Sequence, residues 1–248
     1  MADRELFQFQ SSHFNEKARW ALDLKQVPHV RTSLLPGPHV LTVKKLTGDT
    51  QVPVLRERDR IIAGSAQIID HLEQTFPTPP LYPEDPALRR EALEIQREFD
   101  DEVGPAVRVA LFFEAMDADF AVRSFCEDRS PFARAMYRLS FAPVSRLMKS
   151  KMKIDAANAA AARERTRKAL DFVAERGSAN GHLIGNDFTV ADLACAALLM
   201  VTVPVGEWGG PAIPRTAKVE SWLERWATHP GTTWVEATYR RWRRPPEP

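Results

Sequence analysis

Two adjacent hydroxyl side chains, Ser11 and Ser12, stand where a strand-like run over residues 6–10 gives way to a predicted helix. One face of that helix is apolar at positions i, i+4, i+7 and i+8, which are Phe14, Ala18, Ala21 and Leu22. Ser12 is therefore at or near an N-cap, where unpaired backbone N–H groups favour an oxygen acceptor and an anion. Two interpretations remain open. Ser12 either only caps the helix, which the local pattern favours, or holds a thiolate, whose pKa would be lowered at a helix N-terminus.

Composition restricts the class of protein. The chain has 248 residues, enough for one large or two small domains, and a net charge of +1, which gives no general attraction to nucleic acid or to a membrane. Cys126 and Cys195 are far apart and lack metal-ligand spacing, so we expect buried thiols in a reducing compartment and no metal site. The charged N-terminus predicts no secretory signal, and the apolar run 193–205 is too short to span a bilayer. We expect a cytoplasmic protein without a nucleic-acid partner or stable membrane insertion.

The first 76 residues alternate strand and helix patterns. Pro53 lies inside a strand-like run, so it marks either an edge strand or a cis bond that turns the Val52 backbone toward a ligand. Ser65 is predicted as the N-cap of a helix whose first turn suits a carboxylate. The predicted strands cover 4–10, 29–35, 51–55 and 60–63, and the predicted helices cover 13–26, 40–46 and a segment that opens at 64–65.

A connector with five prolines separates this half from a helical one. We place one domain at 1–76, the connector at 77–86 and an all-helical domain at 87–248. Gly104-Pro105 is expected to kink or divide a long helix. Thr189 and Asp192 resemble a capping box, so Asp192 is assigned to folding and not to chemistry. We predict that Phe112, Phe113 and Met116 lie in the core, with a substrate pocket as the alternative.

Two basic segments stand out in the helical half of the sequence. Residues 129–153 contain seven basic and no acidic side chains, interleaved with aromatic ones. They form either a basic surface for an anionic membrane or ligand, or a solvated helix face with its aromatic side chains turned inward, which we favour. The run Arg240–Arg244 is interpreted most simply as a solvated terminus.

The order of these features along the chain resembles that in members of the glutathione transferase superfamily. Ser-x-Phe-x-x-Lys-x-Arg followed by Ala-Leu is similar to the active-site helix of its serine-type (tau and zeta) and cysteine-type (omega) members. Counting five positions back from Lys17 selects Ser12 as the active residue, with Ser11 as the alternate and His13 where many members have proline. The resemblance implies an α+β fold, with a thioredoxin-like N-terminal domain followed by an all-α helical-bundle domain.

The same resemblance implies an activity. The Ser12 hydroxyl would stabilise the thiolate of glutathione, the co-substrate, which would attack a small apolar electrophile. Two alternatives stay open: a non-catalytic ligand- or partner-binding protein, favoured by Gly64 and His13, and a glutathione-dependent isomerase. The resemblance also implies a homodimer, while the lack of a Cys-x-x-Cys motif argues against dithiol redox chemistry. In the family, an acid occupies the place of Gly64 and a lysine often that of His39. The residues implied in the peptide site are His39, Gln51, Val52, Pro53, Gly64 and Ser65.

Overall fold

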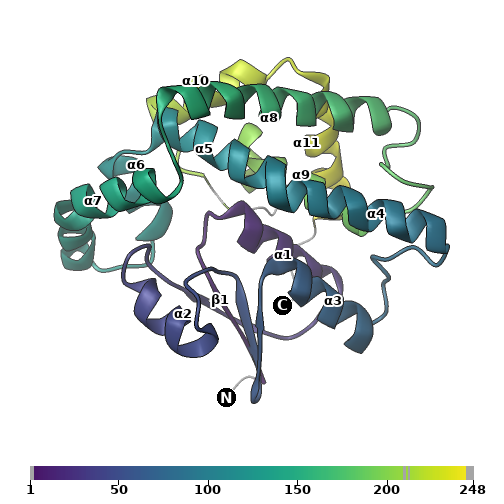
Figure 1. Cartoon of the computed structure of the whole chain (residues 1–248), viewed down its shortest axis with the longest axis horizontal. Helices are drawn as coiled ribbons and strands as arrows, with labels where there is room; N and C mark the ends of the chain where they lie inside the picture. Colours follow the sequence, from purple (N-terminus) through teal and green to yellow (C-terminus); the bar gives the residue numbers. More distant parts are fainter. Residues whose placement is uncertain (1–2, 209–210, 212, 244–248) are drawn as a thin grey trace.

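A small mixed sheet carries one half of the molecule, and a layer of helices lies against it (Figure 1). The computed structural model describes residues 3–208, 211 and 213–243. The strand order is β2-β1-β3-β4, with β2 parallel to β1 and the other two pairs antiparallel. The strands are β1 (Arg4–Gln8), β2 (Val30–Ser33), β3 (Val54–Glu57) and β4 (Arg60–Ala63).

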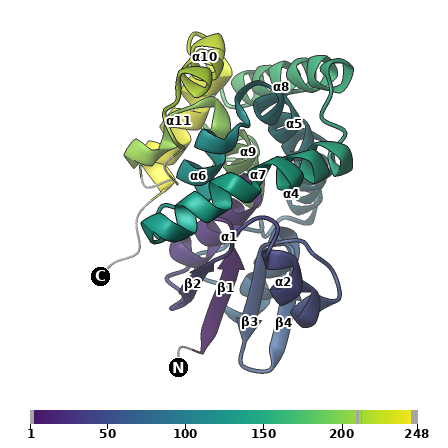
Figure 2. The ribbon, with the colours of Figure 1, turned by 90° about the vertical axis from the view of Figure 1, so that its left-hand side faces the viewer.

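Helices cover both faces of the sheet (Figure 2). Side chains alternate along a strand, so Leu6 and its partner Leu55 belong to the core beneath α1 (His13–Leu24) and α3 (Ser65–Thr75). Phe7 and Val54 point the other way and pack with Val43 of α2 (His39–Thr47). This arrangement is the predicted thioredoxin-like one. Pro53 cannot donate to a strand ladder, and β3 begins one residue after it, later than predicted.

The long helix after the connector is divided where Gly104-Pro105 predicts a break. It consists of α4 (Pro86–Glu98), a π-helix η1 (Phe99–Val103) and α5 (Gly104–Ala115). The wider π turn ends directly before Gly104-Pro105, and such turns often occur at functional sites. The other helical elements are α6 (Ala118–Phe125), α7 (Pro131–Lys151), α8 (Ala156–Arg176), α9 (Val190–Leu199), η2 (Met200–Thr202), η3 (Val205–Trp208), α10 (Ala217–Trp226) and α11 (Pro230–Trp242).

Helix α9 forms the centre of the helical half, and each of its residues is buried. The predicted capping box at its start is confirmed. The Thr189 hydroxyl accepts from the backbone N–H of Ala191, and the Asp192 carboxylate accepts from the backbone N–H groups of Thr189 and Leu183, both at 2.8 Å. None of the described helices is long and apolar enough to cross a membrane.

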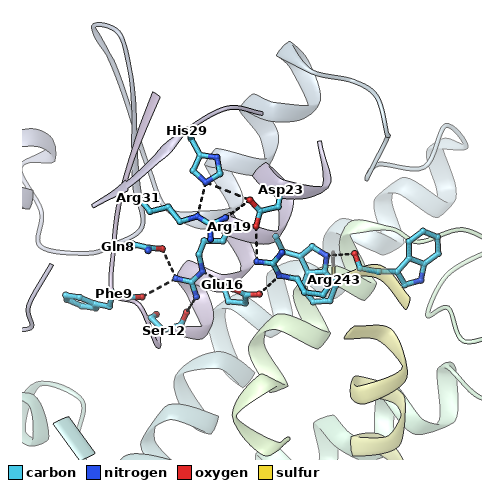
Figure 3. A network of polar contacts seen from close by, with 11 residues as sticks. Gln8, Phe9, Ser12, Glu16, Arg19, Asp23, His29, Arg31 and Arg243 are labelled. Carbon is cyan, nitrogen blue, oxygen red and sulfur yellow. Dashed lines mark hydrogen bonds and ion pairs between the residues drawn. The ribbon is translucent and has the colours of Figure 1, made fainter. Parts of the chain in front are cut away.

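Helix α1 buries charged side chains as well as apolar ones, and the end of the chain completes their pairing (Figure 3). Arg243, just after α11, donates to Glu16 at 2.6 Å and forms an ion pair with Asp23 at 2.9 Å. The interpretation of Arg240–Arg244 as a solvated terminus is wrong for Arg243. This side chain is only 5% exposed because it pairs with the buried carboxylates of Glu16 and Asp23. Arg244 lies outside the described residues.

The basic segment agrees in part with the favoured interpretation. Tyr137 and Phe141 of α7 are buried, so these aromatic side chains do turn inward. Phe132, at the start of the same helix, is 76% exposed, and Leu139 is also exposed. Helix α7 therefore presents apolar as well as basic side chains on its outer face.

Candidate active site

A cavity of about 760 Å³ lies where the sheet half meets the helical half. One wall comes from the start of α1, the segments before α2 and β3, and the start of α3. The opposite wall comes from η1, α5, α6 and α7. The Val52-Pro53 peptide bond is cis. The structure brings together on this cavity all eight residues that the sequence placed in the catalytic and peptide sites, namely Ser11, Ser12, His39, Gln51, Val52, Pro53, Gly64 and Ser65.

Ser12 occupies the N-cap position of α1 with an extended backbone, but its hydroxyl makes no capping hydrogen bond. The interpretation that Ser12 only caps the helix is therefore wrong. The Ser11 hydroxyl instead donates to the backbone carbonyl of Ser124, near the end of α6, at 3.2 Å. Ser12 thus lies at the positive end of α1 with a hydroxyl that is not used to cap the helix.

Arg19 fixes the turn that carries Ser12 (Figure 3). Its guanidinium donates to the Gln8 side chain at 2.6 Å and to the backbone carbonyls of Phe9 and Ser12 at 3.4 and 3.5 Å. It is buried beside Glu16, which accepts from it at 2.8 Å. One buried cation thus ties the end of β1 to the start of α1, so Ser12 sits on a rigid support.

His13 is buried and joins α1 to α5. Its Nε2 donates to the backbone carbonyl of Gly104 at 3.1 Å. Burial, together with the positive charge of Arg108, lowers the pKa of His13 to about 3. The ring is therefore neutral at physiological pH, and His13 acts as a structural bridge between the two halves.

The start of α3 presents unpaired backbone N–H groups to the same cavity. Gly64 is the N-cap with φ +96°, no side chain caps the helix, and Ser65 is its first residue and not its N-cap as predicted. A Cβ atom at Gly64 would lie 2.3 Å from Oε1 of Gln67, and the positive φ also disfavours a side chain there. Gln67, which also lines the cavity, therefore brings an amide oxygen to the place where the resemblance implies an acid.

His39 lies on the cavity wall with both ring nitrogens engaged. Nδ1 accepts from the backbone N–H of Gly37, and Nε2 donates to the carbonyl of Thr50, both at 3.1 Å. Burial lowers the pKa of His39, and the charge of Lys151 lowers it further, so the ring is neutral. The cation on this part of the wall is Lys151, at the end of α7, which the sequence singled out only as part of a basic segment.

The predicted substrate-pocket residues separate in the structure. Phe112 lines the cavity, Phe113 is 43% exposed outside it, and Met116 is buried in the core. Sequence reasoning missed Arg108, which also lines the cavity. Its signal is a single arginine in the apolar run 106–113. Apolar side chains make up most of the wall formed by α5, α6 and α7, namely Leu111, Phe112, Phe120, Phe125, Leu147 and Met148, and Phe14 of α1 also lines the cavity.

The π-helix brings acidic side chains to the rim. Asp100 accepts from the buried Nζ of Lys17 at 2.5 and 2.6 Å, which links α1 to η1. Asp101 is exposed at the cavity edge. Within the described part of the chain, no group of three His, Cys, Asp or Glu side chains is placed to hold a metal ion.

The family models agree with this geometry. The model of the glutathione S-transferase N-terminal domain matches residues 6–80, and that of the C-terminal domain matches residues 125–230. The chain belongs to the glutathione S-transferase superfamily.

Relatives differ in how much of the chain they match. Glutathione S-transferase U1 of Arabidopsis thaliana is 31% identical over 108 residues, which is 42% of this chain and only 48% of that relative. Beta-etherase LigF from Sphingobium sp. strain SYK-6 has a similar structure, with a TM-score of 0.63 at 17% identity, covering 96% of this chain and 99% of that one. FzlA from C. crescentus has a TM-score of 0.60 at 21% identity, covering 95% of this chain and 92% of that one.

A third structure was solved with a ligand. The theta class glutathione S-transferase from Xanthomonas axonopodis pv. citri, with glutathione bound, has a TM-score of 0.57 at 17% identity, covering 98% of this chain and 97% of that one. At such identities the structural likeness establishes the fold alone.

Proposed function

We propose that this protein is a serine-type glutathione transferase. The Ser12 hydroxyl donates a hydrogen bond to the glutathione sulfur and stabilises its thiolate at the positive end of α1. The thiolate then forms a bond to an electrophilic carbon of a small, mostly apolar molecule. The observation that carries the proposal is the Ser12 hydroxyl itself, which lines the cavity and is not used by its own helix.

The polar wall suits the rest of the peptide. The uncapped start of α3 at Ser65 offers N–H groups to the γ-glutamyl carboxylate. Gln67 supplies an amide oxygen for the ammonium group, in place of the acid that family members carry at position 64. We assign the glycyl carboxylate to Lys151 and Gln51, since His39 has no free ring N–H. The main chain at Val52 is assigned to the cysteinyl unit.

The test is Ser12→Ala, assayed with glutathione and 1-chloro-2,4-dinitrobenzene. Loss of one preorganised donor to a charged centre is expected to lower kcat/KM by about 100- to 1,000-fold. The ultraviolet absorbance of bound thiolate should fall in parallel. Ser11→Ala is the matched control, and it should keep most activity because that hydroxyl is bonded to Ser124. An unchanged rate in Ser12→Ala would refute the proposal.

A binding protein without catalysis is the second candidate, favoured by the exposed apolar side chains Phe132 and Leu139 on α7. Calorimetry with glutathione separates the two: no binding at millimolar thiol would favour this second function. A homodimer is the first partner to test, by light scattering of wild type and of Phe132→Ser. We also propose a cytoplasmic location, which the buried free thiols of Cys126 and Cys195 support.

A further inference from the structure

Arg108 is a cation without a counterion in the wall of the cavity. It lies on α5, and its Nε atom is buried and has no hydrogen-bond partner. No other residue in the described part of the chain forms a hydrogen bond or an ion pair with Arg108. The guanidinium carbon lies 5.8 Å from the centre of the Phe14 ring. Asp101, which lines the same cavity, makes no ion pair with it within the described residues.

The buried cations of the described chain are all paired, whereas half-buried Arg108 is not. A carboxylate lies within 3 Å of each of them: Lys17 has Asp100, Arg19 has Glu16, Lys25 has Glu73, and Arg243 has Glu16 and Asp23. Removing part of a guanidinium, here the Nε atom, from water without such a partner costs free energy. Burial accordingly lowers the pKa of Arg108. An anionic group on a ligand would recover that cost.

The fold places Arg108 close to Ser12. His13 is hydrogen-bonded to Gly104, and Arg108 is one helical turn beyond Gly104 on α5. Phe14, beneath the guanidinium, is two residues after Ser12. The neighbouring wall is apolar, with Leu111 and Phe112 from the same helix.

We propose that Arg108 binds a carboxylate on the second substrate, so that the preferred electrophile has an apolar body and one anionic end. A guanidinium can bind a carboxylate through two parallel N–H bonds, which fixes the orientation of the molecule as well as its affinity. The reaction of this substrate rests on the proposed transferase function, but its binding does not.

A matched pair of electrophiles tests the inference. 4-(Chloromethyl)benzoate and methyl 4-(chloromethyl)benzoate share the same reactive carbon and differ in charge. In both, the glutathione sulfur forms a bond to the methylene carbon, the carbon–chlorine bond breaks, and chloride leaves with the bonding electrons. The thiol proton goes to solvent.

Steady-state rates with this pair measure the charge preference. Arg108→Met should lower kcat/KM for the benzoate by about 10- to 100-fold, the value of hydrogen bonds to a charged group, and leave the ester within about twofold. Lys151→Met is the matched control: it should raise KM for glutathione with both electrophiles and leave their ratio unchanged. Equal losses for both electrophiles in Arg108→Met, with a raised KM for glutathione, would place Arg108 in the peptide site and overturn the inference.

Binding without turnover separates this inference from the proposed function. Calorimetry of the full chain without glutathione should give tighter binding of 4-methylbenzoate than of 4-methylbenzamide, and Arg108→Met should lose that difference. The result is expected even if Ser12→Ala shows no loss of activity. If wild type does not prefer the benzoate, the inference is wrong. Arg108→Lys keeps the charge and should retain part of the preference for the benzoate over the benzamide. It serves as the control for a folding defect in Arg108→Met.

Discussion

At the scale of single residues, His13 couples protonation to stability. Its pKa is about 3 in the folded protein and near 6.5 when exposed, so between these values the unfolded chain binds a proton that the native state excludes. Acidification through this window should therefore lower the free energy of unfolding, by at most about 1.4 kcal/mol per pH unit from this group. Above pH 6.5 both states are neutral at this residue and the contribution is constant.

Denaturant unfolding of wild type and His13→Gln at several pH values measures this effect. The glutamine amide can still donate to the Gly104 carbonyl but does not titrate. The stability advantage of wild type over the variant should be constant above neutrality and shrink as the pH falls below 6.5. A difference that stays constant down to pH 4 would contradict the lowered pKa.

The sequence predicted residue positions better than residue roles. Ser12 was located from the helical pattern and the resemblance, and it does lie on the cavity. The roles of His13 and His39 depend on the backbone carbonyls of Gly104 and Thr50, and no local pattern reveals such partners. Arg108 was visible as an arginine among apolar residues, but only the fold reveals that it has no carboxylate beside it.

At the scale of elements, Asp192 accepts two backbone hydrogen bonds at the start of α9, and we predict a role in folding and none in catalysis. Asp192→Ala should remove the acceptor of the Leu183 and Thr189 backbone N–H groups and lower the free energy of unfolding by about 2–4 kcal/mol. Asp155→Ala is the matched control, because it caps α8 at an exposed position and should cost only about 1 kcal/mol. Chemical denaturation measures both.

Activity distinguishes folding from chemistry in the same variants. Asp192 does not line the cavity, so kcat per folded molecule should be unchanged in Asp192→Ala. A well-folded but inactive variant would contradict this assignment.

Most elements follow from periodicity and breakers in the sequence. The predicted β4 coincides with the observed strand over 60–63, and Gly104-Pro105 marks a real division. The π-helix before it was not predicted, because a π turn differs from an α turn by a single residue and its sequence pattern is the same. That element brings Asp100 and Asp101 to the cavity, so the sequence analysis did not predict these two residues as part of the site.

At the scale of the whole molecule, the ion pairs of Arg243 join the two ends of the chain. Arg243→Met should leave Glu16 and Asp23 buried with one fewer cation and lower the free energy of unfolding by about 3–5 kcal/mol. Arg240→Ala, at an exposed position paired with Glu236, should cost only about 0.5 kcal/mol or less. Urea unfolding of the two variants compares them directly. Equal, small effects would mean that the buried pair contributes nothing.

The two-domain architecture was predictable because each half has its own pattern, and the connector between them is rich in proline. The hydrogen bond between Glu16 and Arg243 was not predictable, since 227 positions separate the two residues and an arginine-rich terminal segment is usually solvated.

During synthesis, the N-terminal sheet and its helices leave the ribosome long before Arg243 is translated. Chains usually fold domain by domain in that order, yet here Glu16 and Asp23 on the helix that carries Ser12 lack one of their counterions until Arg243 has been made. A nascent chain stalled after residue 230 should therefore hold this first helix loosely. The helix that carries Ser12 would gain its full set of buried ion pairs only once Arg243 has been made.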